Sequence, residues 1–117
     1  MLRKFSYPNK NRKILIFKEI ETKTGVIKQY IHPEGTSIKA YVRQLSGNEQ
    51  NSLEGVQNAS VIEFVINQRK VEMDMFIEFQ NKVYGIDGDD DGEFYNTEIK
   101  LRGYPVNKKT YTEIRWS

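Results

Sequence analysis

The chain has 117 residues, enough for one domain with a single modest hydrophobic core. It contains no cysteine, which excludes a disulfide framework and a thiolate metal site. No apolar run approaches the roughly 18–20 residues of a membrane-spanning helix, and no apolar stretch follows the basic N-terminus as it does in a signal peptide. We therefore expect no membrane partner and a protein that stays in the compartment where it is made.

Beyond an N-terminal arm at residues 1–12, most of the chain alternates apolar and polar residues with the period of half-buried strands. Turn signals separate the alternating runs, such as KTG at 23–25 and QNK at 80–82. The expected strands cover residues 14–20, 26–31, 38–43, 61–66, 71–79, 83–86 and 97–102, and residues 110–116 could add a short one.

One stretch departs from this pattern. Residues 48–55 (NEQNSLEG) contain no β-branched residue and predict one or two helical turns. The expected fold class is all-β: a small antiparallel β-barrel or sandwich of about six or seven strands with one short helix in a long loop. The arm at 1–12 would precede a barrel domain at 13–103 and a C-terminal tail at 104–117. Two rows of side chains should face the core: Met73, Met75, Ile77 and Phe79 on one strand, and Ile62, Phe64 and Ile66 on another.

The net charge is only +2, but the charged residues are unevenly distributed. Residues 1–18 contain six bases and no acid, and residues 87–98 contain six acids and no base. Opposed patches of this kind could steer head-to-tail contacts between like subunits. Two solvated ends are the simpler interpretation.

The acidic segment also matches a metal-binding pattern. Residues 87–98 (DGDDDGEFYNTE) satisfy the calcium-loop spacing D-x-D-x-D-G-x5-E, whose carboxylates can converge on a hard cation. Such a loop normally lies between two helices, whereas both flanks here predict strands. A solvated acidic hairpin loop is the simpler interpretation, so we expect no metal cofactor. The candidate calcium ligands are Asp87, Asp89, Asp91 and Glu98.

No motif in the chain predicts catalysis. His32 is the only histidine and lies beside Pro33, where a turn residue is expected rather than a base or a metal ligand. No nucleophile elbow and no glycine-rich phosphate loop before a helix occurs, so we expect no enzyme and no cofactor. Aromatic residues near the strands could stack on single-stranded nucleic acid, but acids alternate with them and oppose a phosphate backbone. A small calcium- or nucleic-acid-binding β module remains an alternative.

Several short patterns occur in an order that is typical of one family. Residues 40–49 (AYVRQLSGNE) follow A-x-V-x-x-L-S-G-x-E, and residues 74–86 (DMFIEFQNKVYGI) follow D-M-x-I-x-F/Y-x-x-x-x-Y-x-I. A polar segment at 87–96 and a last strand at 97–101 come next. This order resembles the head–tail joining family of long-tailed bacteriophages, also called head-closure or stopper proteins. The resemblance covers roughly residues 12–102; the density of aspartate in the polar segment and the tail beyond the last strand depart from it.

The resemblance implies a structural virion protein of the phage neck, made in the cytoplasm of the bacterial host. Such proteins form a homo-oligomeric ring, commonly a dodecamer, beneath the portal and adaptor proteins. The ring keeps packaged double-stranded DNA from leaking, without sequence specificity, and presents a surface to the tail proteins. Another neck ring protein, such as a tail terminator, is the alternative.

In the family that the chain resembles, one loop projects into the central channel and closes it. The corresponding segment, residues 44–58, is rich in neutral amides and hydroxyls. These groups can hydrogen-bond to copies of themselves and do not grip phosphates as Lys or Arg would. An ordinary surface connection is the simpler interpretation. The expected gate residues are Gln44, Ser46, Gly47, Asn48, Gln50, Asn51, Ser52, Gln57 and Asn58.

Overall fold

The computed structural model describes residues 10–44, 61–67, 69–90 and 98–117, with the backbone alone at 88–90. These residues form β-strands and turns, and no helix occurs among them. Accordingly, no helix in the described ranges is long and apolar enough to cross a membrane. The strands are β1 (Arg12–Thr22), β2 (Gly25–Tyr30), β3 (Ile38–Gln44), β4 (Ile62–Asn67), β5 (Phe76–Phe79), β6 (Lys82–Asp90), β7 (Glu98–Val106) and β8 (Glu113–Arg115).

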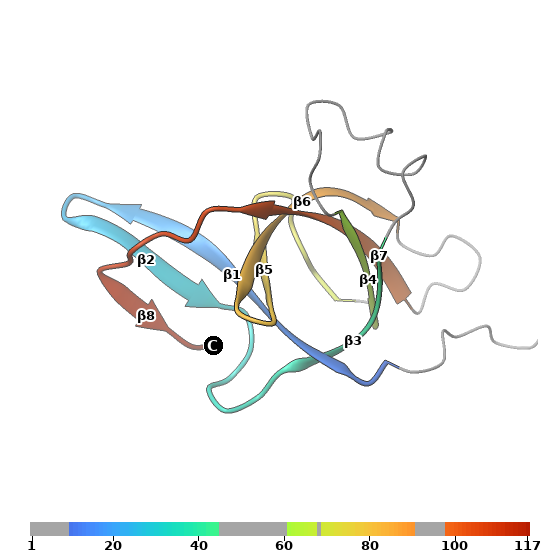
Figure 1. Ribbon diagram of the computed structural model, residues 1–117. Coiled ribbons are helices and arrows are strands. Elements are labelled where there is room, and N and C mark those ends of the chain that lie inside the picture. The colour runs from blue at the N-terminus through green and yellow to red at the C-terminus, as the bar shows by residue number, and fades with distance from the viewer. Residues whose placement is uncertain (1–9, 45–60, 68, 91–97) are drawn as a thin grey trace, which may run out of the picture.

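Six antiparallel strands close into a small barrel (Figure 1). Their order is β3-β4-β7-β6-β5-β1, and the first part of β1 pairs back onto β3, from Arg12 opposite Ala40 to Ile14 opposite Ile38. Because the barrel is closed, each of these six strands is hydrogen-bonded to a neighbour on both sides over at least part of its length. The all-β barrel expected from the sequence is confirmed, whereas the helix expected at residues 48–55 lies outside the described residues.

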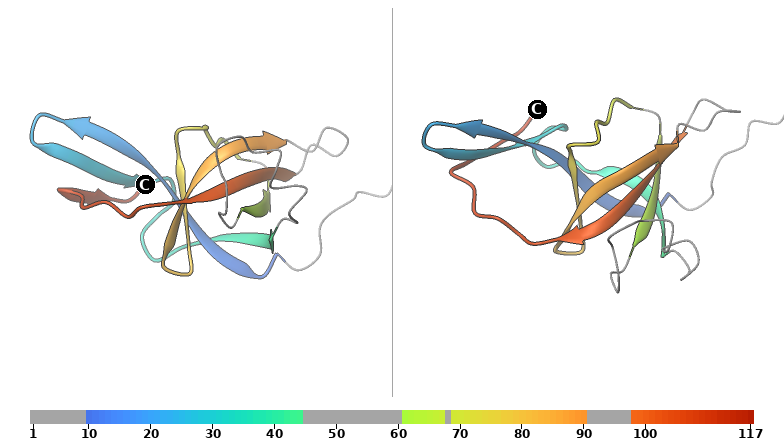
Figure 2. Two further views of the ribbon diagram at one scale, coloured as in Figure 1. Left: turned by 45° about the horizontal axis from the view of Figure 1, so that its top comes forward. Right: turned by 90° about the horizontal axis from the view of Figure 1, so that it is seen from above.

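The second part of β1 leaves the barrel and forms a long hairpin with β2, from Phe17 opposite Tyr30 to Thr22 opposite Gly25. This hairpin projects from one end of the barrel, and β8 lies along its outer edge, parallel to β2 (Figures 1 and 2). The protein is elongated as a result, with principal extents of 54 × 33 × 22 Å. Eight strands therefore divide into a closed barrel and a three-stranded extension.

Inward-facing side chains of the barrel strands fill its interior. Phe64 is fully buried and meets Phe79 and Tyr84 edge-on, with ring centroids 5.7 and 5.6 Å apart. Edge-to-face pairs of this kind add to the free energy gained by burying the rings. The core residues are Ile14, Ile16, Ile38, Ala40, Phe64, Ile66, Met75, Ile77, Phe79, Tyr84, Ile86, Ile99 and Leu101.

Packing inside the barrel requires a glycine at position 103. A Cβ atom at Gly103 would lie 2.9 Å from Cε2 of Phe64 and 3.0 Å from Cβ of Tyr84. Two residues further along β7, Pro105 pairs with β6 alone, because the pairing of β7 with β4 ends at Gly103. Proline is tolerated at position 105 because β7 has no neighbouring strand on the β4 side there to accept a hydrogen bond from a backbone N–H.

The predicted strand at residues 71–79 is wrong in its first half. A turn closed by a hydrogen bond from the Met75 N–H to the Glu72 carbonyl ends the alternation, and β5 begins only at Phe76. Met73 is consequently 50 % exposed rather than in the core, and Ile62 is only partly buried. The remaining members of both predicted rows are buried: Met75, Ile77, Phe79, Phe64 and Ile66.

The turn predicted between β5 and β6 is present as a two-residue hairpin loop. Gln80 and Asn81 have φ angles of +51° and +64°, and Phe79 pairs with Lys82 across them. Two consecutive positive φ angles are those of a type I′ turn, whose twist matches that of antiparallel strands. β7 is longer than predicted, since it continues past residue 102 to Val106.

Candidate interaction surfaces

The basic and acidic segments of the sequence meet within one molecule. The Nζ of Lys10 forms an ion pair with the carboxylate of Glu98, which is only 6 % exposed. Across the adjoining strands, Asp90 of β6 lies opposite Lys100 of β7. Lys10 and Glu98 therefore bring one residue of each charged segment together, whereas Lys18 of the basic segment lies on the projecting hairpin opposite Gln29.

The candidate calcium ligands lie on strands where the structure describes them. Asp87 is exposed at a β-bulge, because Ile86 pairs with Gly103 while Gly88 already pairs with Arg102. β6 then continues through Asp89, which lies opposite Leu101, so these positions have extended backbone rather than the curled backbone of a calcium loop.

Of the other two candidates, Glu98 binds Lys10 and Asp91 lies outside the described residues. No group of three or more His, Asp or Glu side chains is placed to hold a metal in the part of the chain that the structure describes. The calcium hypothesis stays a prediction.

The expected gate segment is described only at its first residue, Gln44. Gln44 is the exposed last residue of β3 and pairs with Ile62 at the start of β4. The connection thus leaves and re-enters the barrel on two neighbouring strands. The other expected gate residues lie outside the described residues: Ser46, Gly47, Asn48, Gln50, Asn51, Ser52, Gln57 and Asn58.

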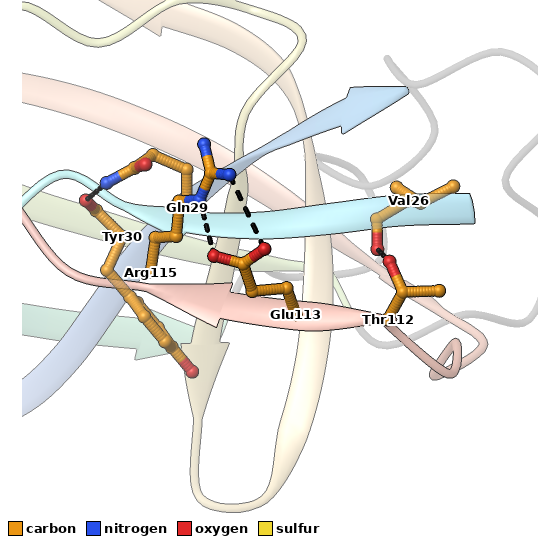
Figure 3. Close-up of polar contacts among 6 residues, drawn as sticks. All are labelled: Val26, Gln29, Tyr30, Thr112, Glu113 and Arg115. Atoms are coloured by element: carbon orange, nitrogen blue, oxygen red, sulfur yellow. Dashed lines mark hydrogen bonds and ion pairs between the residues drawn. The ribbon is translucent and has the colours of Figure 1, made fainter. Parts of the chain in front are cut away.

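The C-terminal segment, residues 107–117, is fastened to the projecting hairpin. Both the N–H and the hydroxyl of Thr112 donate to the Val26 carbonyl, at 2.9 and 3.1 Å, and Figure 3 shows the second of these bonds. β8 then runs beside β2, and the Ser117 N–H donates to the His32 carbonyl at 3.2 Å. A sequence-based assignment of residues 104–117 as a tail does not reveal this attachment.

Close approach of this segment depends on a glycine in the hairpin turn. Gly25 has a φ of +151°, which L side chains rarely adopt, and a Cβ there would lie 2.2 Å from Cγ2 of Thr112. Gly25 therefore has a second role besides forming the turn, because the absence of a side chain leaves room for Thr112 of the C-terminal segment.

A second apolar cluster, which we call the outer aromatic cluster, joins the hairpin to the barrel. Phe17 lies at its centre, stacked on Phe76 at 5.4 Å and edge-on to Tyr111 at 5.9 Å. Trp116 stacks on Tyr30, with centroids 4.0 Å apart and ring planes 12° apart. The cluster comprises Phe17, Tyr30, Val83, Leu15, Phe76, Val106, Tyr111 and Trp116.

A charged pair is built into this cluster. The Nζ of Lys28 lies 2.6 Å from a carboxylate oxygen of Glu78, and the Tyr30 hydroxyl donates to the same carboxylate. The Lys28 ammonium also lies 4.5 Å from the ring centre of Phe17 and 5.4 Å from that of Tyr111. Cation–π attraction strengthens as water is excluded, so the ammonium holds the rings of β1, β2 and the C-terminal segment together.

His32 lies beside this cluster. It is buried, its Nδ1 is 3.3 Å from the Pro33 carbonyl, and its ring meets that of Trp116 at 5.7 Å. Nε2 is buried without a hydrogen-bond partner among the described residues. The expected position near a turn is observed, and the ring also covers the C-terminal tryptophan.

Two tyrosine hydroxyls of the cluster are shielded from ionisation. Burial raises the pKa of Tyr30 well above its ordinary value, and its hydrogen bond to the Glu78 carboxylate raises it further. Burial and a 2.7 Å hydrogen bond to Glu19 raise the pKa of Tyr111 in the same way. Both hydroxyls therefore act as neutral donors to carboxylates.

A raised folded-state pKa stabilises the fold fully below the unfolded pKa of about 10, and this contribution is lost as the pH rises from there toward the folded pKa. We therefore expect the melting temperature to fall as the pH rises above about 10. The variant Tyr30→Phe with Tyr111→Phe should show a shallower fall in melts followed by circular dichroism. An equally steep fall in both proteins would show that groups other than these two tyrosines cause it.

No protein-family model matches the chain, and a comparison with curated proteins found no match either. The assignment of a function therefore depends on the sequence patterns and on the geometry of the surfaces described above.

Proposed function

We propose that this protein is a structural protein of the bacteriophage neck: a ring-forming head-completion protein, or head–tail connector, that closes the DNA channel and docks the tail. The order of the patterns at residues 40–49 and 74–86 carries this proposal. The second pattern forms the β5–β6 hairpin with its type I′ turn, and the first begins on β3. The local structure is thus compatible with what the family resemblance implies.

The distribution of side-chain types supports a structural role rather than a catalytic one. Several titratable side chains around the outer aromatic cluster are engaged with one another, such as Lys28 with Glu78 and Tyr111 with Glu19. These contacts fasten strands and do not leave an activated nucleophile beside a base. A closed barrel with a projecting hairpin is also a shape that can pack side by side in a ring.

The proposed partners follow from this position in a virion. Copies of the chain would form the ring, commonly a dodecamer, between the portal or adaptor protein and the tail proteins. Packaged double-stranded DNA would occupy the channel without being read for sequence. The protein would be made in the cytoplasm of the bacterial host and end in the neck of the virion.

Electron microscopy of negatively stained mixtures tests this position. Purified protein added to filled heads that lack tails should appear as a ring at the portal vertex. Rings found on the ends of free tails instead would favour the tail-terminator alternative. If the protein associates with neither particle, the neck assignment is wrong.

The gate is tested separately by shortening the segment between β3 and β4. Deleting residues 48–52 should leave the barrel folded, because every core residue that the structure describes lies elsewhere in the chain, but filled heads carrying the variant should lose DNA. DNA retention is measured by nuclease sensitivity of the purified heads. A matched control is Lys23→Ser with Thr24→Ser in the exposed hairpin turn, which should retain DNA. If the shortened protein assembles on heads and they keep their DNA, the segment is not the gate.

A further inference from the structure

An open groove lies where the projecting hairpin meets β5, β6 and β7. Its volume is about 400 Å³, and it opens widely to solvent. Phe76 and Tyr104 contribute aromatic surface, and Met73 at its rim is 50 % exposed. The full lining is Glu19, Glu21, Met73, Asp74, Met75, Phe76, Gly85, Ile86 and Tyr104.

The groove is acidic. It is lined by three carboxylates and by no basic residue. Glu19 is already bound by Lys109 and Tyr111, but Glu21 and Asp74 are exposed and have no ion-pair partner among the described residues. A large exposed methionine beside unpaired carboxylates is typical of a surface that binds another chain.

An apolar floor with an acidic rim fits an extended segment that is both basic and apolar. The first nine residues of this chain, MLRKFSYPN, have that composition: two bases, no acid, and Leu2, Phe5 and Tyr7 as apolar side chains. Complementary charge orients such a segment, and the apolar side chains supply buried area. We infer that the groove binds the N-terminal segment, residues 1–9, of a second copy of this chain.

The segment of the same molecule could reach the groove only with its first residues and at full extension. Lys10 is held at the far end of the barrel by Glu98, and β1 runs from there to the groove. At about 3.3 Å per residue, the nine steps from Lys10 to Glu19 cover about 30 Å. Arg3 lies seven residues before Lys10 and reaches at most about 25 Å from it. A neighbouring molecule is under no such constraint.

This contact is heterologous, since the end of one copy meets the groove of the next, and repetition of such a contact generates a ring or a filament. The inference thus deepens the proposed ring, on which it rests for its biological meaning. It differs from head-to-tail steering by the acidic segment at 87–98, whose Glu98 is already paired with Lys10.

The test uses a synthetic peptide of residues 1–9, labelled at its C-terminus and titrated with the full-length protein while fluorescence anisotropy is recorded. Saturable binding is expected, and raising the salt concentration should weaken it. Glu21→Lys with Asp74→Lys should weaken binding about tenfold or more, because two attractions become repulsions. A peptide carrying Arg3→Glu and Lys4→Glu should instead prefer this charge-reversed protein.

The control protein is Glu34→Lys with Glu113→Lys, which changes the net charge equally at exposed positions outside the groove. It should bind the natural peptide as the unaltered protein does. Absence of saturable binding, equal weakening in both double variants, or failure of the reversed peptide to prefer the reversed groove would each overturn the inference. The assay requires neither heads nor rings, so its failure is distinguishable from failure of the neck proposal.

Discussion

Replacement of Phe64 by alanine is expected to lower the free energy of unfolding by about 3–5 kcal/mol, the usual cost of removing a buried aromatic side chain. Phe64 is fully buried and touches both Phe79 and Tyr84 inside the barrel. A domain of this size is typically stable by about 5–15 kcal/mol, so the variant should be close to unfolding. Urea denaturation followed by circular dichroism measures the loss.

A second substitution checks that packing against Phe64 is the cause. Gly103→Ala inserts a methyl group against that ring and should cost about 1–3 kcal/mol by overpacking. Combined with Phe64→Leu, it should cost less than the sum of the two single variants, since the smaller side chain makes room for the methyl group. Additive losses would mean that the backbone of β7, rather than the ring contact, sets the requirement for glycine.

Replacement of Lys28 by methionine should lower the free energy of unfolding by about 2 kcal/mol, less than the cost of breaking a fully buried ion pair because Glu78 is partly exposed. The variant keeps the length of the side chain but leaves the Glu78 carboxylate with the Tyr30 hydroxyl alone. It also removes the cation from the rings of Phe17 and Tyr111. Trp116 is the only tryptophan, so its fluorescence should report loosening of the C-terminal segment.

The exposed pair of Arg115 with Glu113 is the matched control (Figure 3). Arg115→Met should leave the stability nearly unchanged, as is usual for solvated ion pairs. Glu78→Gln combined with Lys28→Met completes a double-mutant cycle, and a coupling near zero would show that Lys28 acts through packing alone.

Much of the barrel could be predicted from the sequence because its determinants are local. Alternation of apolar and polar residues forces the backbone to be extended wherever one face is buried, as at β3 and β4. The hairpin at Gln80 and Asn81 follows from a short polar break between two apolar runs. The prediction that Met73 lies in a strand is wrong because the residues of the turn at 72–75 continue the apolar–polar alternation and include no Gly or Pro that would signal a turn.

The surfaces proposed to bind other molecules depended on contacts between distant parts of the chain. The pairing of Lys10 with Glu98 could not be expected from two charge-rich segments, because charge patterns do not specify which ends of a barrel coincide. The groove likewise combines β1 with the turn before β5 and with β7. The aromatic residues of the tail were the one available signal that it does not remain in solvent.

By itself the sequence determined that this protein is an all-β domain and where its principal strands lie, and its short patterns are the basis of the proposed phage function. Those properties depend on hydrophobic period and turn chemistry, which act over a few residues. Only the tertiary structure decided that the barrel closes through β1 and β3 and that Tyr111 and Trp116 fasten the C-terminal segment to the hairpin. It also shows Glu21 and Asp74 in the groove without an ion-pair partner among the described residues. Strand order and side-chain partners are set by the packing of the whole chain, because a contact between residues far apart in sequence forms only when the intervening strands are also packed.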